Sequence, residues 1–103
     1  IAARRGVAVE RTPTHDVSAV PCAPWLQQRL AESVARVGVA PRRLPSGAGH
    51  DAMILARATD VGMLFVRCGA GGVSHDPAET VSAQDARLAA AALLDFLRHF
   101  AAP

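Results

Sequence analysis

The sequence predicts one α/β domain, or part of one, with a mostly parallel sheet and helices on its faces. Its 103 residues are enough for a single modest core. Two segments with helical apolar spacing lie on either side of a continuous apolar run at 63–66. Such a run between turn signals is typical of a strand that is buried on both faces of a parallel sheet.

The first helix is predicted to begin at Pro24, because proline suits the first position of a helix. Gly38 is expected to end it, since glycine readily adopts the left-handed conformation of a helix terminus. One apolar stripe, spaced by four, four and three residues, consists of Leu26, Leu30, Val34 and Val37.

The last helix is predicted to span about 83–100, with Ser82 as its cap and Asp85 three residues later as a weaker form of the capping box. Its buried face is expected to comprise Ala86, Ala90, Leu93, Leu97 and Phe100. Its solvent face is expected to comprise Gln84, Arg87, Asp95 and Arg98.

Three shorter features complete the chain. Residues 6–11 alternate apolar and polar, as expected for a half-buried strand, and Pro13 ends the pattern. The proline-containing segment 12–23 has no helical period and is predicted to be a connector. A short helix is expected from Ala52 to Arg57, after the glycine turn at 46–49.

Composition excludes several function classes. The net charge of +2 is too small to predict a nucleic-acid or membrane partner, and no apolar run is long enough to span a bilayer. All eleven basic residues are Arg, so no lysine is present for a Walker loop or a Schiff base. Cys22 and Cys68 match no zinc-finger or disulfide pattern, and we interpret both as reduced thiols of a cytoplasmic protein.

The histidines carry most of the chemical information. Three of the four, at positions 15, 50 and 75, are followed directly by Asp. His50 and His75 lie in or beside glycine loops that flank the predicted 63–66 strand, and ligands of open α/β sheets bind in loops beyond strand ends. His15 and His99 are interpreted as surface residues, although the role of the His15–Asp16 pair stays open.

The residues alone leave two classes of function open. The glycine loop at 69–74 ends on Ser and is not followed at once by a helical pattern, which disfavours a dinucleotide site. His75 is either a metal ligand or an ordinary loop histidine. A metal-dependent enzyme therefore competes with a non-catalytic α/β module whose glycine loops bind a small anion.

Two motifs carry a resemblance to a known family. Ser-Gly-Ala-Gly-His-Asp-Ala at 46–52 and Gly-Val-Ser-His-Asp-Pro-Ala-Glu at 72–79 resemble the C-terminal part of the dinuclear-metal amidohydrolases. This family includes N-carbamoyl-L-amino-acid hydrolases, allantoate amidohydrolases and β-ureidopropionases, and is similar to aminoacylase- and carboxypeptidase-like metallopeptidases. The resemblance runs from about 7 to 97. The chain departs from the family pattern at Val73 and Asp76, where Ile and Asn are more common.

The resemblance implies a division of the chain. Residues 1–14 would end a lid or dimerisation domain, and residues 15–22 would be a connector. Residues 23–103 would form the C-terminal part of a three-layer, metallopeptidase-like catalytic domain.

The resemblance also implies roles for five residues. His75 would be a metal ligand, supported by Glu79, which could instead anchor the start of the last helix. His50 would be the catalytic residue, binding the substrate and donating to the developing oxyanion. Gly49 would let the backbone approach the substrate, and Asp51 would orient His50 or cap the helix after it.

The implied reaction is hydrolysis of a linear amide or ureido C–N bond, as in N-carbamoyl amino acids or allantoate. Two divalent ions, from among Zn, Mn, Ni and Co, would serve a cytoplasmic, homodimeric parent enzyme. The general base and the remaining ligands would lie outside this chain. The segment alone is therefore expected to bind no metal and to be inert.

Overall fold

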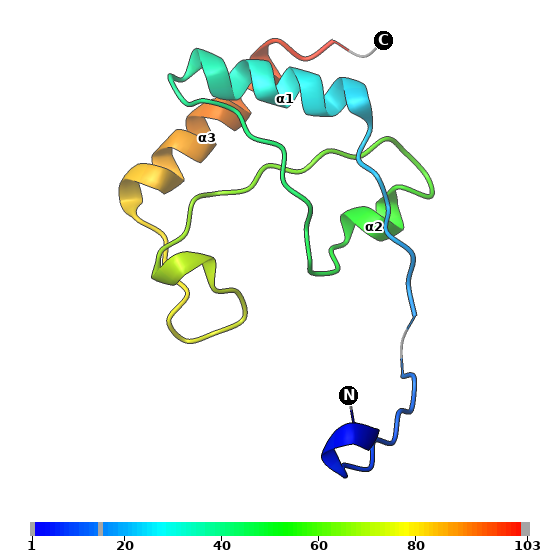
Figure 1. The fold of residues 1–103 in the computed structure, drawn as a ribbon. Coiled ribbons are helices and arrows are strands. Elements are labelled where there is room, and N and C mark those ends of the chain that lie inside the picture. The colour runs from blue at the N-terminus through cyan, green and yellow to red at the C-terminus, as the bar shows by residue number, and fades with distance from the viewer. Residues whose placement is uncertain (1, 15, 102–103) are drawn as a thin grey trace.

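The computed structural model describes residues 2–14 and 16–101 (Figure 1). In chain order, its elements are the 3₁₀ helix η1 (Ala3–Arg5), α1 (Pro24–Arg36), α2 (Ala52–Leu55), the 3₁₀ helix η2 (Ala70–Gly72) and α3 (Ala83–Arg98). The predicted helices all occur, although α2 and α3 each end two residues before the predicted position. No helix within these described residues is long and apolar enough to cross a membrane.

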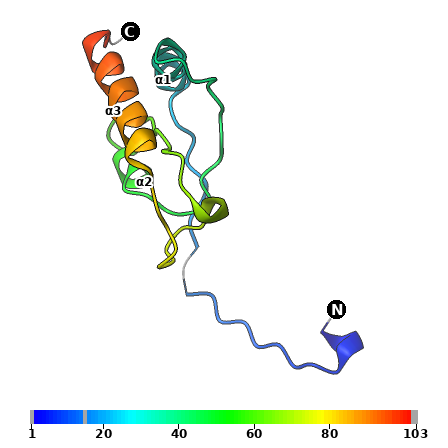
Figure 2. The ribbon, with the colours of Figure 1, turned by 90° about the vertical axis from the view of Figure 1, so that its left-hand side faces the viewer.

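The core lies between α1 and α3, which pack side by side (Figure 2). Its buried apolar residues are Leu26 and Leu30 from α1 and Ala92 from α3. Ser33 is the most deeply buried side chain, at 1% exposure. The first half of the predicted α1 stripe is therefore confirmed as core, and the small Ser33 and Ala92 allow the two helices to approach closely.

The ends of both long helices follow from local chemistry. Pro24 occupies the start of α1, and Gly38 follows the helix in the left-handed region at φ 83°. At α3, the Ser82 hydroxyl accepts a hydrogen bond from the Asp85 N–H at 3.0 Å and donates to Asp85 Oδ2 at 2.6 Å. Ser82 is thus confirmed as the cap of α3, whereas the Asp85 carboxylate accepts from the Ser82 hydroxyl and does not complete a capping box.

The predicted buried face of α3 is wrong. Leu93, Leu97 and Phe100 are 46%, 61% and 52% exposed. The less exposed face of α3 instead comprises Leu88, Ala89, Ala92, Asp95 and Phe96. Since α3 is apolar on two faces, its own pattern does not decide which face packs, and complementarity with α1 does.

Asp95 supplies much of that complementarity. It was expected on the solvent face, yet its side chain is 20% exposed and contacts Arg36 of α1. The Arg36 Nε donates to Asp95 Oδ2 at 2.8 Å, and another guanidinium nitrogen donates to Ser33 Oγ at 2.9 Å. The hydrogen bond from Arg36 is the main cause that lowers the pKa of Asp95 below its ordinary value.

The predicted sheet is not observed, because no residue in 2–14 or 16–101 belongs to a strand. Residues 7–11 and 63–66 form no strand ladder, and Gly6 is the left-handed residue that ends η1. Backbone groups of a strand need a neighbouring strand as hydrogen-bond partner. Around the 63–66 run, isolated bonds from Ala23 N–H to Val61 O and from Gly69 N–H to Thr80 O, both 2.8 Å, take the place of a ladder.

The N-terminal segment projects away from the body (Figures 1 and 2). Residues 3–14 are exposed, and the backbone hydrogen bonds of η1 are local. The described part of the segment therefore packs poorly on the rest of the chain. Its assignment to a separate domain stays a prediction.

The molecule is expanded for its length. Its radius of gyration is 18.2 Å, whereas a compact domain of this length has about 13 Å. Its accessible surface is 8497 Å², against about 5,500 Å² for a compact protein of the same mass. Large apolar side chains such as Val9, Phe65 and Leu97 contribute to this surface. The described fold therefore leaves extensive apolar surface uncovered.

Candidate functional site

The first motif forms a hydrogen-bonded turn directly before α2. The Ser46 hydroxyl donates to the Ala48 carbonyl oxygen at 2.9 Å and accepts weakly from the Ala48 N–H at 3.3 Å. The Nε2 atom of His50 lies 3.0 Å from Ser46 Oγ. The turn thus closes on itself and holds the His50 ring on its exposed surface.

Gly49 and Asp51 flank this histidine. A Cβ atom on Gly49 would meet only Met53 Sδ, at 3.8 Å, so the space beside the Gly49 backbone is open. Asp51 precedes α2, but its side chain makes no capping hydrogen bond. The partner of the His50 ring is Ser46. Neither role expected for Asp51 is therefore observed.

The second motif forms an irregular loop after η2. Gly71, Gly72 and His75 all have positive φ, and His75 lies at φ 58°. This left-handed conformation is uncommon for a residue with a side chain, and it occurs often at functional sites. The loop therefore places His75 in a conformation that its surroundings must maintain.

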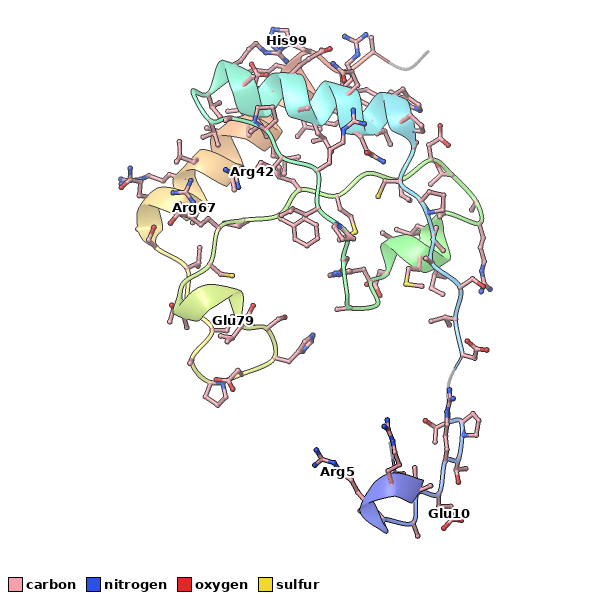
Figure 3. All side chains as sticks on the ribbon, in the orientation of Figure 1. Arg5, Glu10, Arg42, Arg67, Glu79 and His99 are labelled. Carbon is pink, nitrogen blue, oxygen red and sulfur yellow. The ribbon has the colours of Figure 1, made fainter. Side chains whose placement is uncertain are left out.

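Carboxylates within the loop maintain that conformation. Glu79 Oε2 accepts a hydrogen bond from the backbone N–H of His75 at 2.9 Å, and Asp76 Oδ1 accepts from the Ala78 N–H at 2.8 Å. Figure 3 labels Glu79 in this loop. Glu79 thus anchors the backbone of His75 and does not hold its imidazole ring.

The two motif loops lie on the same side of the molecule, away from the C-terminal end of α3 (Figures 1 and 2). His99 lies at that end, beside α1 (Figure 3). Its Nδ1 atom is 2.8 Å from the Asp95 carbonyl oxygen, as expected for a residue at a helix terminus. His15 lies outside the described residues.

The second motif contains one histidine, His75, with a ring that could coordinate a metal ion. The His75 side chain is exposed, and no hydrogen bond to another described residue occupies its ring. Among residues 2–14 and 16–101, no group of three or more His, Cys, Asp or Glu side chains is arranged to hold a metal ion. The described part of the chain fits a single contributed ligand and not a complete metal centre.

An open hollow lies elsewhere, between α1, α3 and the segment 59–64. This open pocket of about 530 Å³ is mostly apolar, and Trp25, Leu30, Leu64, Phe96 and Phe100 are among its lining residues. Its carboxylate, Asp60, accepts a hydrogen bond from Trp25 Nε1 at 2.7 Å. Since neither motif histidine lines it, the pocket is uncovered core surface and not the candidate site.

Sequence reasoning missed one member of the site. Ser46 lies outside a Gly-x-Ser-x-Gly pattern, so the sequence does not mark it as a nucleophile. The available signal was its position four residues before His50 in a glycine turn. Such a turn brings the two side chains together.

Comparisons with known proteins support the family resemblance that the two motifs carry. The family model described as peptidase family M20/M25/M40 matches residues 5–99. A probable allantoate deiminase of Oryza sativa subsp. japonica is 47% identical over 94 residues, covering 81% of this chain and 19% of the relative. An N-carbamoyl-L-amino-acid amidohydrolase of Paenarthrobacter aurescens is 38% identical over 87 residues, covering 84% and 21%.

A third relative, the allantoate amidohydrolase of Bacillus subtilis (strain 168), is 37% identical over 81 residues, covering 79% of this chain and 19% of its own. The chain thus spans about a fifth of the length of the curated relatives that it matches. No solved structure matches the chain.

Proposed function

This chain belongs to peptidase family M20/M25/M40, and from that membership we propose that it is the C-terminal part of a metal-dependent amidohydrolase. The substrate class is a linear amide or ureido compound, such as allantoate or an N-carbamoyl amino acid. The relatives' names support this class, since they include both allantoate and N-carbamoyl amino acid amidohydrolases. The match of both histidine motifs within one family domain carries the proposal.

The uncovered surface supports the proposal that further chain completes the catalytic domain. An excess of about 3,000 Å² over a compact protein of this mass, with apolar side chains such as Phe65 and Leu97 exposed, fits a segment that packs against more protein. The parallel sheet is proposed to form when extended segments such as 63–66 gain neighbouring strands. Residues 1–14 then belong to a lid or dimerisation domain, and 15–22 to the connector.

Within this enzyme, divalent ions would supply an activated hydroxide and polarise the scissile carbonyl. Zn, Mn, Ni and Co all suit a site with histidine and carboxylate ligands. His75 is proposed to offer one ring nitrogen to a metal ion, while Glu79 fixes the backbone of His75 by the 2.9 Å hydrogen bond. Maintaining that left-handed residue keeps the ligand in one orientation.

His50 is proposed to bind the substrate's carbonyl oxygen and to stabilise the negative charge that develops there. The open space beside Gly49 allows the substrate to approach the backbone. The full-length enzyme is proposed to be a cytoplasmic homodimer, with its general base and other metal ligands outside this chain. The isolated segment is proposed to be inactive and free of metal.

The experiment measures metal content and turnover of the full-length protein with N-carbamoyl amino acids and allantoate. His75→Ala should lower metal occupancy and turnover together, and added metal should restore part of the activity. His50→Ala should keep its metal but lose a factor on the order of 10²–10³ in kcat, as removal of an oxyanion donor does. His99→Ala is the matched control, because His99 lies away from both loops, and it should behave like wild type.

Two outcomes would contradict the assignment. Metal loss in His50→Ala together with full metal in His75→Ala would reverse the two roles. If neither variant changed kcat by more than about threefold, or roughly 0.7 kcal/mol, the active-site interpretation would fail. The alternative, a non-catalytic α/β module that binds a small anion in its glycine loops, would then be favoured.

A further inference from the structure

We propose that Ser46 is a positioning residue that holds the His50 ring by Nε2 and leaves Nδ1 as the ring atom available to the substrate. The observation is the closed turn at 46–50, in which Ser46 Oγ lies 3.0 Å from His50 Nε2 and 2.9 Å from the Ala48 carbonyl oxygen. Both side chains are exposed, so the ring is held by this contact and not by burial.

Counting protons assigns the direction of each hydrogen bond. A serine hydroxyl has one proton to donate and two lone pairs that accept. The Ala48 carbonyl oxygen has no proton, so its 2.9 Å contact with Ser46 Oγ is a hydrogen bond only when the Ser46 proton lies between the two atoms. Ser46 Oγ can then only accept from the His50 ring.

His50 must therefore carry a proton on Nε2. The second lone pair of Ser46 Oγ faces the Ala48 N–H at 3.3 Å, so the hydroxyl group uses its donor and both its acceptor sites. In a neutral His50 ring, Nδ1 is consequently unprotonated and accepts hydrogen bonds. The turn thus selects the tautomer of the histidine as well as its position.

The tautomer specifies how His50 would act on the substrate. This inference rests on the proposed function. Nε2–H is already engaged by Ser46, so donation to a substrate carbonyl oxygen must come from Nδ1–H. A ring that has protons on both nitrogens is an imidazolium. The form of His50 that stabilises an oxyanion is then positively charged, and the charge strengthens the hydrogen bond to the developing anion.

Nitrogen-15 NMR of the histidine rings tests the assignment without any need for activity. The full chain is labelled at histidine and recorded about two pH units above the ordinary histidine pKa of about 6.5, and His50→Gln identifies the signals. We expect an unprotonated Nδ1 and a protonated Nε2 at His50. Ser46→Ala should shift the signals toward the tautomer mixture of a free histidine, and Ser46→Thr, which keeps the hydroxyl, should restore them.

Ser18→Ala is the matched control, because Ser18 is an exposed serine outside the turn, and it should leave the His50 signals unchanged. A protonated Nδ1 in wild type would overturn the proposal, since the Ser46 proton would then point at the ring. Wild-type signals that match the free-histidine mixture, or a Ser46→Ala spectrum identical to wild type, would overturn it as well.

Kinetics of the full-length protein give a second measurement. Ser46→Ala should lower kcat by less than His50→Ala does, with unchanged metal content, and Ser46→Thr should recover most of the loss. Equal kcat in Ser46→Ala and wild type would refute the positioning role. Absence of hydrolysis in wild type would refute the proposed function, but the NMR result on the tautomer would stand.

Discussion

Truncation of Leu30 tests whether the α1–α3 contact holds this chain together. Leu30 is 9% exposed, and its Cδ1 would lie 3.2 Å from a Cβ built on Gly62, so its side chain fills the space between α1 and segment 59–64. Leu30→Ala removes three carbon atoms, which at about 0.8 kcal/mol each gives about 2.4 kcal/mol. The space left by the truncation joins an open pocket, so the added cavity cost is small. We expect a loss of about 2–3 kcal/mol in the free energy of unfolding.

Leu97→Ala is the matched control, because the same side chain is removed from a helix where it is 61% exposed. It should change the unfolding free energy of the chain by less than about 0.5 kcal/mol. Urea unfolding followed by far-ultraviolet circular dichroism measures both variants. Equal losses in the two variants would refute the packing described for α3. In the full-length protein, further chain is proposed to cover this face of α3. Leu97→Ala should there lower the free energy of unfolding as much as Leu30→Ala does.

Two further predictions concern the ends and the pairing of the helices. Ser82→Ala removes the cap of α3 and should destabilise the chain by about 1 kcal/mol, whereas Ser82→Thr should retain most of the stability in the same urea experiment. Because Arg36 lowers the pKa of Asp95, the ionised Asp95 stabilises the folded state fully above its ordinary value of 3.8, and this contribution is lost as pH falls through the lowered pKa. Asp95→Asn should therefore show a weaker loss of stability below pH 3.8 than wild type does, and parallel acid profiles would contradict the pairing.

The helix ends could be predicted from the sequence because their causes are local. Pro24, Gly38 and Ser82 act on backbone groups within one turn, and each does so where expected. The face of α3 could not be predicted, because its choice depends on Ser33 and Arg36 in another helix. No pattern within 83–98 contains that information.

Whether the predicted sheet forms also depends on residues outside the segment, so the sequence pattern alone could not decide it. An apolar run such as 63–66 indicates a segment suited to burial, but a strand exists only when another strand satisfies its backbone. The candidate site could likewise be predicted only in part. The positions of His50 and His75 in glycine loops follow from the sequence, whereas the contact with Ser46 and the left-handed backbone of His75 required the structure.

The contact between Arg36 and Asp95 joins residues that are 59 positions apart. Both histidine motifs lie within the loop that this contact closes. Closing that loop lowers the conformational entropy of the chain, and the packing of α1 on α3 must compensate for this loss. This cost rises only logarithmically with loop length, and doubling the loop would add about 0.6 kcal/mol. Insertions between the motifs should therefore cost little stability, whereas loss of the packing between α1 and α3 would release both motif loops together.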